Sequence, residues 1–228
     1  DGGRVTGPSD YDWIDLGATE DPPDHEFAST DQYKSDISLL NYLLHDLRVL
    51  MRRHAKGEIA LDPHDVVAWE VHGLQRRTVV CDPEGLLGSG PVHIVGFFGD
   101  RRRDADQRTI DMSEFNLIDE FRTYPGILSY SSTELVDHYW ANLVVHTHPD
   151  DRETWRHSEA HVHAVDVVAP NAYHSVRIHN GFIRDGVTGS RTVNLVRTKY
   201  WDYDCDPPWV ACRELPGGQS ESLTGPVM

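Results

Sequence analysis

The chain has 228 residues, 39% of them hydrophobic, with six Trp, nine Tyr and six Phe, so it is long and apolar enough for one large domain or two small ones. Its formal net charge of −16 argues against non-specific binding to nucleic acid or to anionic lipid, because both require a basic surface. The absence of a long apolar run or a secretory signal excludes a membrane span and, with three cysteines that form no recognisable framework, favours a cytoplasmic protein.

The N-terminal third divides into two predicted segments. Residues 1–33 are rich in Asp, Pro, Gly and Ser and predict an irregular arm. Residues 34–91 predict an extension made of one helix and two strands. Apolar residues recur every three or four positions from Lys34 to His54, which is typical of an amphipathic helix, and Gly57 can end it. The strands are expected at Val66–His72 and Arg77–Cys81.

Residues 92–201 predict an α+β domain. Its elements are, in order, a strand at Val92–Phe98, a helix capped at about Ser113, paired strands at Ile127–Leu135 and His138–Thr147, a helix at Arg152–Val168 ended by Pro170, and a strand at Tyr173–Ile183. This βαββαβ order is that of the ferredoxin-like fold. A further strand is expected at Arg191–Trp201, and residues 202–228 predict an irregular tail.

The strand that begins at His138 has two different faces. Alternation places Ala141 and Leu143 on an apolar face, and Trp140, Asn142 and Val144 on the other. The second face is polar and aromatic, as the wall of a ligand cavity would be. Because both helices of a ferredoxin-like unit cover one face of its sheet, we expect this second face to be solvated or buried by another sheet, and Trp140 and Val144 favour burial.

The second helix of the unit carries two histidines that matter for chemistry. His157 and His161 lie about 40° apart on a helix, beside an apolar arc. An imidazole on that side can bind a metal or haem iron, or act as a base with a shifted pKa. The alternative is a core histidine bonded to a backbone carbonyl.

The last strand of the unit carries a cation beside an imidazole. Arg177 and His179 are predicted to share a face with Tyr173 and Ser175, where they can stabilise a carboxylate or an enolate oxygen. The alternative is that Arg177 pairs with one of the 37 acidic residues.

A His-x-His pair, His146 and His148, precedes Asp150 and is a weak indication of a metal site. The sequence contains no zinc-protease His-Glu-x-x-His, no phosphate-binding Gly-x-x-x-x-Gly-Lys and no Gly-x-Ser-x-Gly, so those enzyme classes are excluded.

Residues 92–184 resemble the dimeric α/β-barrel superfamily, which includes the antibiotic-biosynthesis monooxygenase-like proteins. Three segments carry the resemblance: 140–145 (WANLVV), 155–158 (WRHS) and 169–181 (APNAYHSVRIHNG). The resemblance implies a homodimer whose two sheets face each other around a pocket. In the haem-using branches of the superfamily a late helix supplies the iron ligand, a position matched here by His161 or His157. The long N-terminal extension and the extra strand depart from the small monooxygenase pattern.

Three hypotheses follow. The first is a monooxygenase-like oxidoreductase acting on a small, largely apolar organic molecule, with His161 as base, Arg177 and His179 as oxyanion stabilisers, and a pocket wall formed by Trp140, Asn142 and Tyr173. The second is a haem-dependent dehydratase, lyase or peroxide enzyme with His161 as axial ligand. The third is a non-catalytic ligand-binding or stress-type module.

Overall fold

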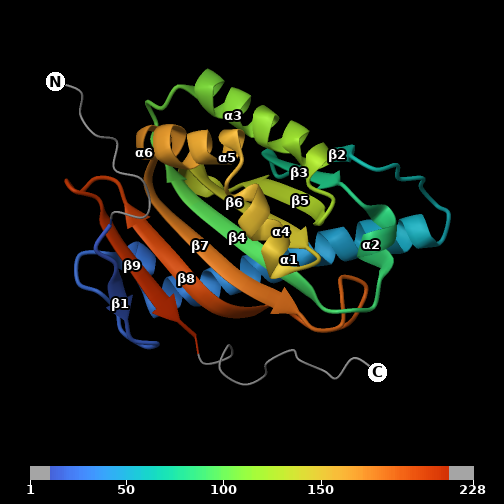
Figure 1. The fold of residues 1–228 in the computed structure, drawn as a ribbon, viewed down its shortest axis with the longest axis horizontal. Helices are drawn as coiled ribbons and strands as arrows, with labels where there is room; N and C mark the ends of the chain where they lie inside the picture. Colours follow the sequence, from blue (N-terminus) through green and yellow to red (C-terminus); the bar gives the residue numbers. More distant parts are fainter. Residues whose placement is uncertain (1–10, 216–228) are drawn as a thin grey trace.

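The computed structural model describes residues 11–215, except for the side chains of residues 152 and 153. Within this range nine strands form one sheet in the order β1-β9-β8-β7-β4-β6-β5-β3-β2 (Figure 1). The strands are β1 (Ile14–Leu16), β2 (Asp65–Val71), β3 (Leu74–Val80), β4 (Val92–Arg101), β5 (Ile127–Glu134), β6 (Tyr139–His146), β7 (Tyr173–Ile183), β8 (Asn194–Asp202) and β9 (Trp209–Glu214). The combination of helices with a mostly antiparallel sheet agrees with the predicted α+β class.

The centre of the sheet has the predicted element order. β4, β5, β6 and β7 alternate with helical segments as β-α-β-β-α-β, and their spatial order is β7-β4-β6-β5 with every neighbouring pair antiparallel. β3 and β2 extend this sheet at one edge, and β8, β9 and β1 extend it at the other. The predicted extension of residues 34–91 therefore shares the sheet of the central unit.

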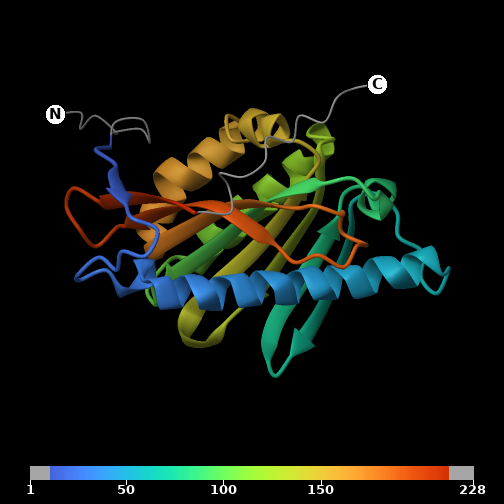
Figure 2. The same cartoon turned by 90° about the horizontal axis from the view of Figure 1, so that it is seen from below.

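One face of the sheet is covered by α1 (Thr30–Ala55), a single helix of 26 residues (Figure 2). Ser29 caps its N-terminus by accepting a hydrogen bond from the amide of Gln32. The predicted leucine stripe is buried against the centre of the sheet, where Leu40 packs over Gly96; a Cβ at Gly96 would lie 2.8 Å from that leucine. The apolar face of β6, with Ala141 and Leu143, belongs to this core.

The other face of the sheet carries α3 and the helical segments that connect β6 to β7 (Figures 1 and 2). They are α3 (Gln107–Glu120), α4 (Pro149–Trp155), α5 (Glu159–His163), a π-helical turn at Ala164–Val168 and α6 (Ala169–Ala172); the short α2 (Pro83–Leu87) and the 3₁₀ turns η1 (Glu26–Ala28), η2 (Phe121–Thr123) and η3 (Val136–His138) lie in connections. The polar, aromatic face of β6 lies beneath these helices, because Val144 packs with Phe121 and Trp155. This face is buried at Val144, as favoured by the sequence, but helical segments cover it and not a second sheet. The apolar face of β6 is covered by α1 instead.

Both helices of the central unit differ from their predicted bounds. α3 begins at Gln107 behind the cap Asp106, and Ser113 is buried inside it rather than at its start. The second helix is interrupted at residues 156–158, and Ser158 caps a new start at α5. Pro170 does not end the helix. Because proline has no amide hydrogen, the ladder widens before it, and the amide of Ala169 bonds to the carbonyl of Ala164, five residues earlier.

The two ends of the described chain meet at the edge of the sheet formed by β1 and β9. The tail predicted as irregular from residue 202 contains β9, which pairs antiparallel with β8 and parallel with β1 of the predicted arm. Arg213 of β9 is 1% exposed and donates to the carbonyl oxygens of Gly17, Ala18, Glu20 and Ala28 at 2.7–3.2 Å. This side chain holds an arm that has little apolar periodicity of its own.

Among the described residues, no helix combines the length and apolar character needed to cross a bilayer.

Candidate functional site

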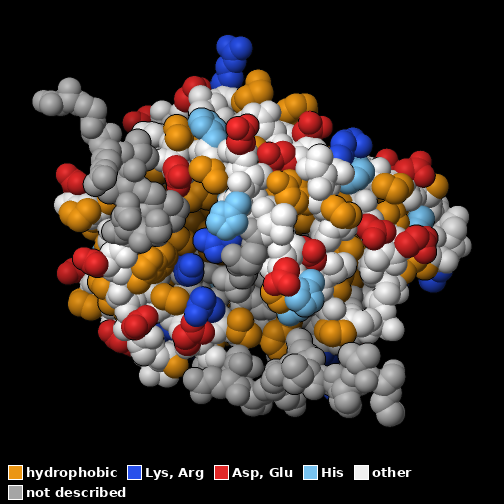
Figure 3. Space-filling model, viewed as in Figure 1, with side chains coloured by type: hydrophobic (Ala, Val, Ile, Leu, Met, Phe, Trp, Pro, Cys, Tyr) orange, Lys and Arg blue, Asp and Glu red, His pale blue; other side chains and the backbone are white. Residues whose placement is uncertain are grey.

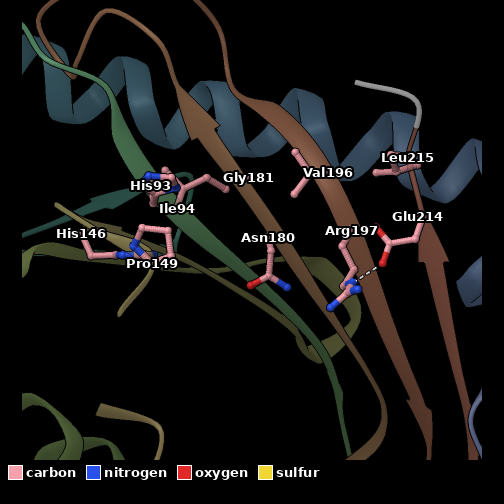
Figure 4. A pocket seen from close by; sticks show the side chains of 10 residues that line it. All are labelled: His93, Ile94, His146, Pro149, Asn180, Gly181, Val196, Arg197, Glu214 and Leu215. Carbon is pink, nitrogen blue, oxygen red and sulfur yellow. Dashed lines mark hydrogen bonds and ion pairs between the residues drawn. The ribbon is translucent and has the colours of Figure 1, made fainter. Parts of the chain in front are cut away.

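A cavity of about 400 Å³ lies on the face of the sheet that bears α3 to α6, next to Pro149 at the start of α4 (Figure 4). Its lining comes from the starts of β4 and β8 and from the C-terminal halves of β6, β7 and β9. Its lining is part polar and part apolar: His93, Ile94, His146, Pro149, Asn180, Gly181, Val196, Arg197, Glu214 and Leu215. A volume of this size is in the range of small-molecule sites.

Strand register brings the polar residues of the cavity together. His93 of β4 lies opposite His146 of β6, and Asn180 of β7 lies opposite Arg197 of β8, which in turn lies opposite Glu214 of β9. Residues directly opposite each other in an antiparallel sheet point to the same face. Five polar side chains from five strands therefore project from one face of the sheet near Pro149 (Figure 4): His93, His146, Asn180, Arg197 and Glu214.

The pairing of β7 with β8 is irregular next to these side chains. The β7–β8 register shifts between Asn180 and Gly181. A Cβ at Gly181 would lie 2.2 Å from the carbonyl oxygen of Asn194, so the close approach of the two backbones requires glycine here. This irregularity forms part of the wall, with Gly181 and Val196 on either side of it.

Arg197 is the cation of the cavity. Its Nε atom pairs with Oε1 of Glu214, and this hydrogen bond raises the pKa of Arg197. The Arg197 side chain is about half exposed, so its guanidinium lies at the solvent side of the wall. Lys199, two residues along β8, faces the same side, because it pairs with Ile178 as Arg197 pairs with Asn180. Lys and Arg side chains gather beside a His in the region of β7 and β8 (Figure 3), although the whole chain is strongly acidic.

The imidazoles of the cavity are arranged by the backbone. Nδ1 of His146 lies 2.8 Å from the carbonyl oxygen of His148; since a carbonyl only accepts, Nδ1 carries the hydrogen. In its neutral form His146 then has its basic nitrogen at Nε2. The ring of His93 lies roughly parallel to that of His146, with centroids 5.8 Å apart, and His148 approaches His93 at 6.2 Å. Within residues 11–215 no group of three or more His, Cys, Asp or Glu side chains is placed to hold a metal ion.

Arg177 and His179 lie on the opposite face of the sheet, beneath α1. Arg177 donates Nε and Nη2 to the two carboxylate oxygens of Asp36 at 2.7 and 2.9 Å, and Nε2 of His179 lies 2.9 Å from the same carboxylate. Nδ1 of His179 lies 2.8 Å from the hydroxyl of Thr198. All four side chains are at most 2% exposed. The alternative of an acidic partner for Arg177 is realised. The group has the composition of a Thr-His-Asp triad, but α1 covers it and none of its members lines the cavity.

His161 is enclosed between helices rather than facing a cavity. Its ring packs edge-on against Trp155 at 4.7 Å, and burial together with the charge of Arg156 lowers its pKa to about 4. A hydrogen bond to the backbone of Arg156 matches the alternative of a satisfied core histidine. His157 is exposed in the turn between α4 and α5, not on the helix face that was predicted. Neither residue lines the cavity, and these surroundings do not fit an axial haem ligand.

The predicted wall residues share the face of the cavity but lie toward the other end of the strands. The guanidinium of Arg101 lies 4.6 Å from the Trp140 ring, and Asn142 has a buried Oδ1 without a hydrogen-bond partner among the described residues. Tyr173 lies on this face too, against Phe97 at 5.4 Å, and not with Arg177 as predicted. A register shift between Asp100 and Arg101 changes the alternation there. Burial raises the pKa of Tyr173.

Sequence reasoning missed His93, Asn180, Arg197 and Glu214. Each is a single polar residue in a strand, and only strand register places them together. His146 was noted, but with His148 rather than with His93 as its neighbour. The arrangement can bind a molecule that offers an acidic group to Arg197 and an apolar body to Val196 and Pro149.

Comparisons with known proteins add little to this picture. No protein-family model and no curated protein matches the chain. Among solved structures, the chain is similar to protein SO0527 from Shewanella oneidensis, with 12% identity and a TM-score of 0.38 over 43% of this chain and 96% of that protein. A similarity at this level carries no argument about fold or function.

Proposed function

We propose that the protein binds a small organic anion with a largely apolar body in the cavity between β4, β7, β8 and α4. The observation that carries the proposal is the convergence of Arg197, Asn180 and two imidazoles on one hollow of an otherwise acidic molecule. This is the ligand-binding module among the three hypotheses, with its site moved from the residues first predicted.

The chemistry of the lining supports an acidic ligand. Glu214 takes the Nε side of Arg197, and a guanidinium has further N–H groups that match a carboxylate. The side-chain amide of Asn180 stands next to it in the sheet and can donate to the same group. Val196 and Pro149 offer apolar contact to the rest of the molecule.

Calorimetric titration with benzoate, and with benzamide as its neutral analogue, tests this proposal. We expect benzoate to bind more tightly than benzamide, and Arg197→Met to weaken benzoate about tenfold or more, since a hydrogen bond to a charged group contributes roughly 1.5–3 kcal/mol. Arg103→Met, at an exposed loop arginine, is the matched control and should leave binding unchanged. Glu214→Gln should tighten benzoate, because it removes the competing carboxylate. Equal binding of the two probes, or of wild type and Arg197→Met, would contradict the proposal.

A second candidate is an enzyme that uses His146 as a general base. The bond from His146 Nδ1 to the carbonyl of His148 favours it, because this tautomer directs a basic nitrogen away from the backbone. The monooxygenase-like oxidoreductase of the dimeric α/β-barrel type stays a prediction, with His146 in place of His161. Oxygen uptake with phenolic substrates should then disappear in His146→Gln and persist in His161→Gln. Uptake that is lost only in the His161 variant would contradict this candidate.

A further inference from the structure

The two edges of the sheet differ in length and exposure. β1 forms one edge with three residues, whereas β2 forms the other with seven and is paired with β3 along its whole length. The turn of the β2–β3 hairpin projects beyond α1 (Figure 2). The outer backbone groups of β2 have no neighbouring strand in the sheet of residues 11–215.

β2 lacks the features that usually protect an edge strand. Its sequence, DVVAWEV, contains no proline and no lysine, and its pairing with β3 shows no bulge. Its two charges are Asp65 and Glu70. A long, regular edge of this kind is a template for strand addition.

Apolar side chains are exposed beside this edge, on the face of the sheet that bears α3. Val66 of β2 is 55% exposed, and on α3 Met112 and Phe115 are 55% and 66% exposed. Val66 and Phe115 also line a second cavity of about 400 Å³ between α3 and the hairpin. Exposed apolar residues that cluster in this way mark an interaction surface.

The sequence of β2 is complementary to itself when two copies run antiparallel about Ala68. Val67 of one copy then lies opposite Trp69 of the other, an aromatic and β-branched pair that stabilises sheets. Glu70 lies opposite Val66, and Asp65 lies opposite Val71, so no two carboxylates meet. Val66 and Ala68 of both copies would face the same side as Phe115. Pairing centred on Glu70 instead would oppose like charges.

We propose that two copies of the chain associate through β2, by antiparallel pairing about Ala68, into one continuous sheet. Both faces of the central sheet are already covered, by α1 on one side and by α3 to α6 on the other. The edge, rather than a sheet face, is therefore the surface available for a symmetric contact. The pairing is isologous, so it closes at two copies.

Light scattering coupled to size-exclusion chromatography tests this dimer. Wild type should elute near twice the chain mass of 25.8 kDa. Ala68→Glu, at an exposed residue that would lie opposite itself, should elute as a single chain with an unchanged circular-dichroism spectrum. Val136→Glu adds the same charge at a residue that is 69% exposed in the β5–β6 connection and should stay dimeric.

A charge-swap experiment assigns the register. Ala68→Lys alone should be monomeric, and an equimolar mixture with Ala68→Glu should regain the mass of two chains. A wild type that is monomeric at concentrations up to about 100 µM would overturn the proposal. An Ala68→Glu variant that stays dimeric would also overturn it, because the contact would then lie on another surface; a variant mixture that stays monomeric would refute the register about Ala68.

Discussion

Arg177 of β7 and Asp36 of α1 form a two-pronged ion pair between the sheet and the helix that covers it, across 141 residues of sequence. Gln32 and His179 add hydrogen bonds to the same carboxylate at 3.0 and 2.9 Å. The pair therefore fixes α1 on the sheet at one position along its length.

Removing both partners of this pair should cost less than the sum of the two single losses. Asp36→Ala leaves a buried guanidinium without its counter-charge, and we expect a loss of about 3–5 kcal/mol in the free energy of unfolding. Asp36→Ala combined with Arg177→Met should lose less than the sum of the two single variants. Urea unfolding of the four proteins measures this coupling. Additive losses would show that the two side chains act independently.

The same pair should make stability depend on acid. Burial alone would raise the pKa of Asp36, but the hydrogen bond from His179 and the charge of Arg177 outweigh it and hold the pKa below its ordinary value. The unfolded carboxyl then binds a proton at higher pH than the folded one. Stability from this group is present above about pH 4 and is lost as pH falls further. Asp36→Asn should have a flatter profile in that window; parallel profiles would refute the assignment.

His161 should act in a different pH window. Its folded pKa is about 4, so between its ordinary value near 6.5 and that pH the unfolded state binds the extra proton. The free energy of unfolding should therefore decrease as pH falls through this range. His161→Gln should remove that slope, and NMR titration of the ring should give a midpoint near 4. A midpoint near 6.5 would show that the ring is solvated.

The Arg213 side chain should hold the N-terminal arm. We expect Arg213→Met to release residues 13–28, because it removes the donors to four backbone carbonyl groups of this segment. Hydrogen exchange should rise in that segment and stay low in α1. Arg191→Met, at an exposed arginine, is the control. Trp13 packs against Trp201 at 5.2 Å, and Leu16 is buried with Tyr200. Unchanged protection in residues 13–28 would mean that these apolar contacts are enough to hold the arm.

Local patterns predicted most of the elements but not their neighbours. The leucine stripe of α1 and the run of alternating strands depend on nearby residues, so the order of the central unit could be read directly. The strand β9 could not, because it is stabilised by pairing with β8 and β1 and follows a proline-rich turn. The interruption of the second helix at residues 156–158 depends on Ser158 and its hydrogen bond to Glu120, 38 residues away.

The faces of the sheet were harder to assign than its strands. Both faces of β6 are covered by helices, so alternation alone could not tell which face α1 takes. The site was missed for the same reason. Arg177 and His179 had the right chemistry, but their partner Asp36 lies in a distant helix. His93, Asn180 and Arg197 come together only through register, which a single sequence does not specify.

The central claim is that an organic anion binds at His93, His146 and Arg197. Long-range proton–nitrogen NMR spectra of the histidine rings, recorded during a titration with benzoate, test it most directly. We expect the His93 and His146 signals to shift in a saturable manner, with no change at the enclosed His161 and His179. In Arg197→Met the same shifts should need about tenfold more benzoate or higher. Signals that do not move, or a shift at His161 instead, would contradict the account.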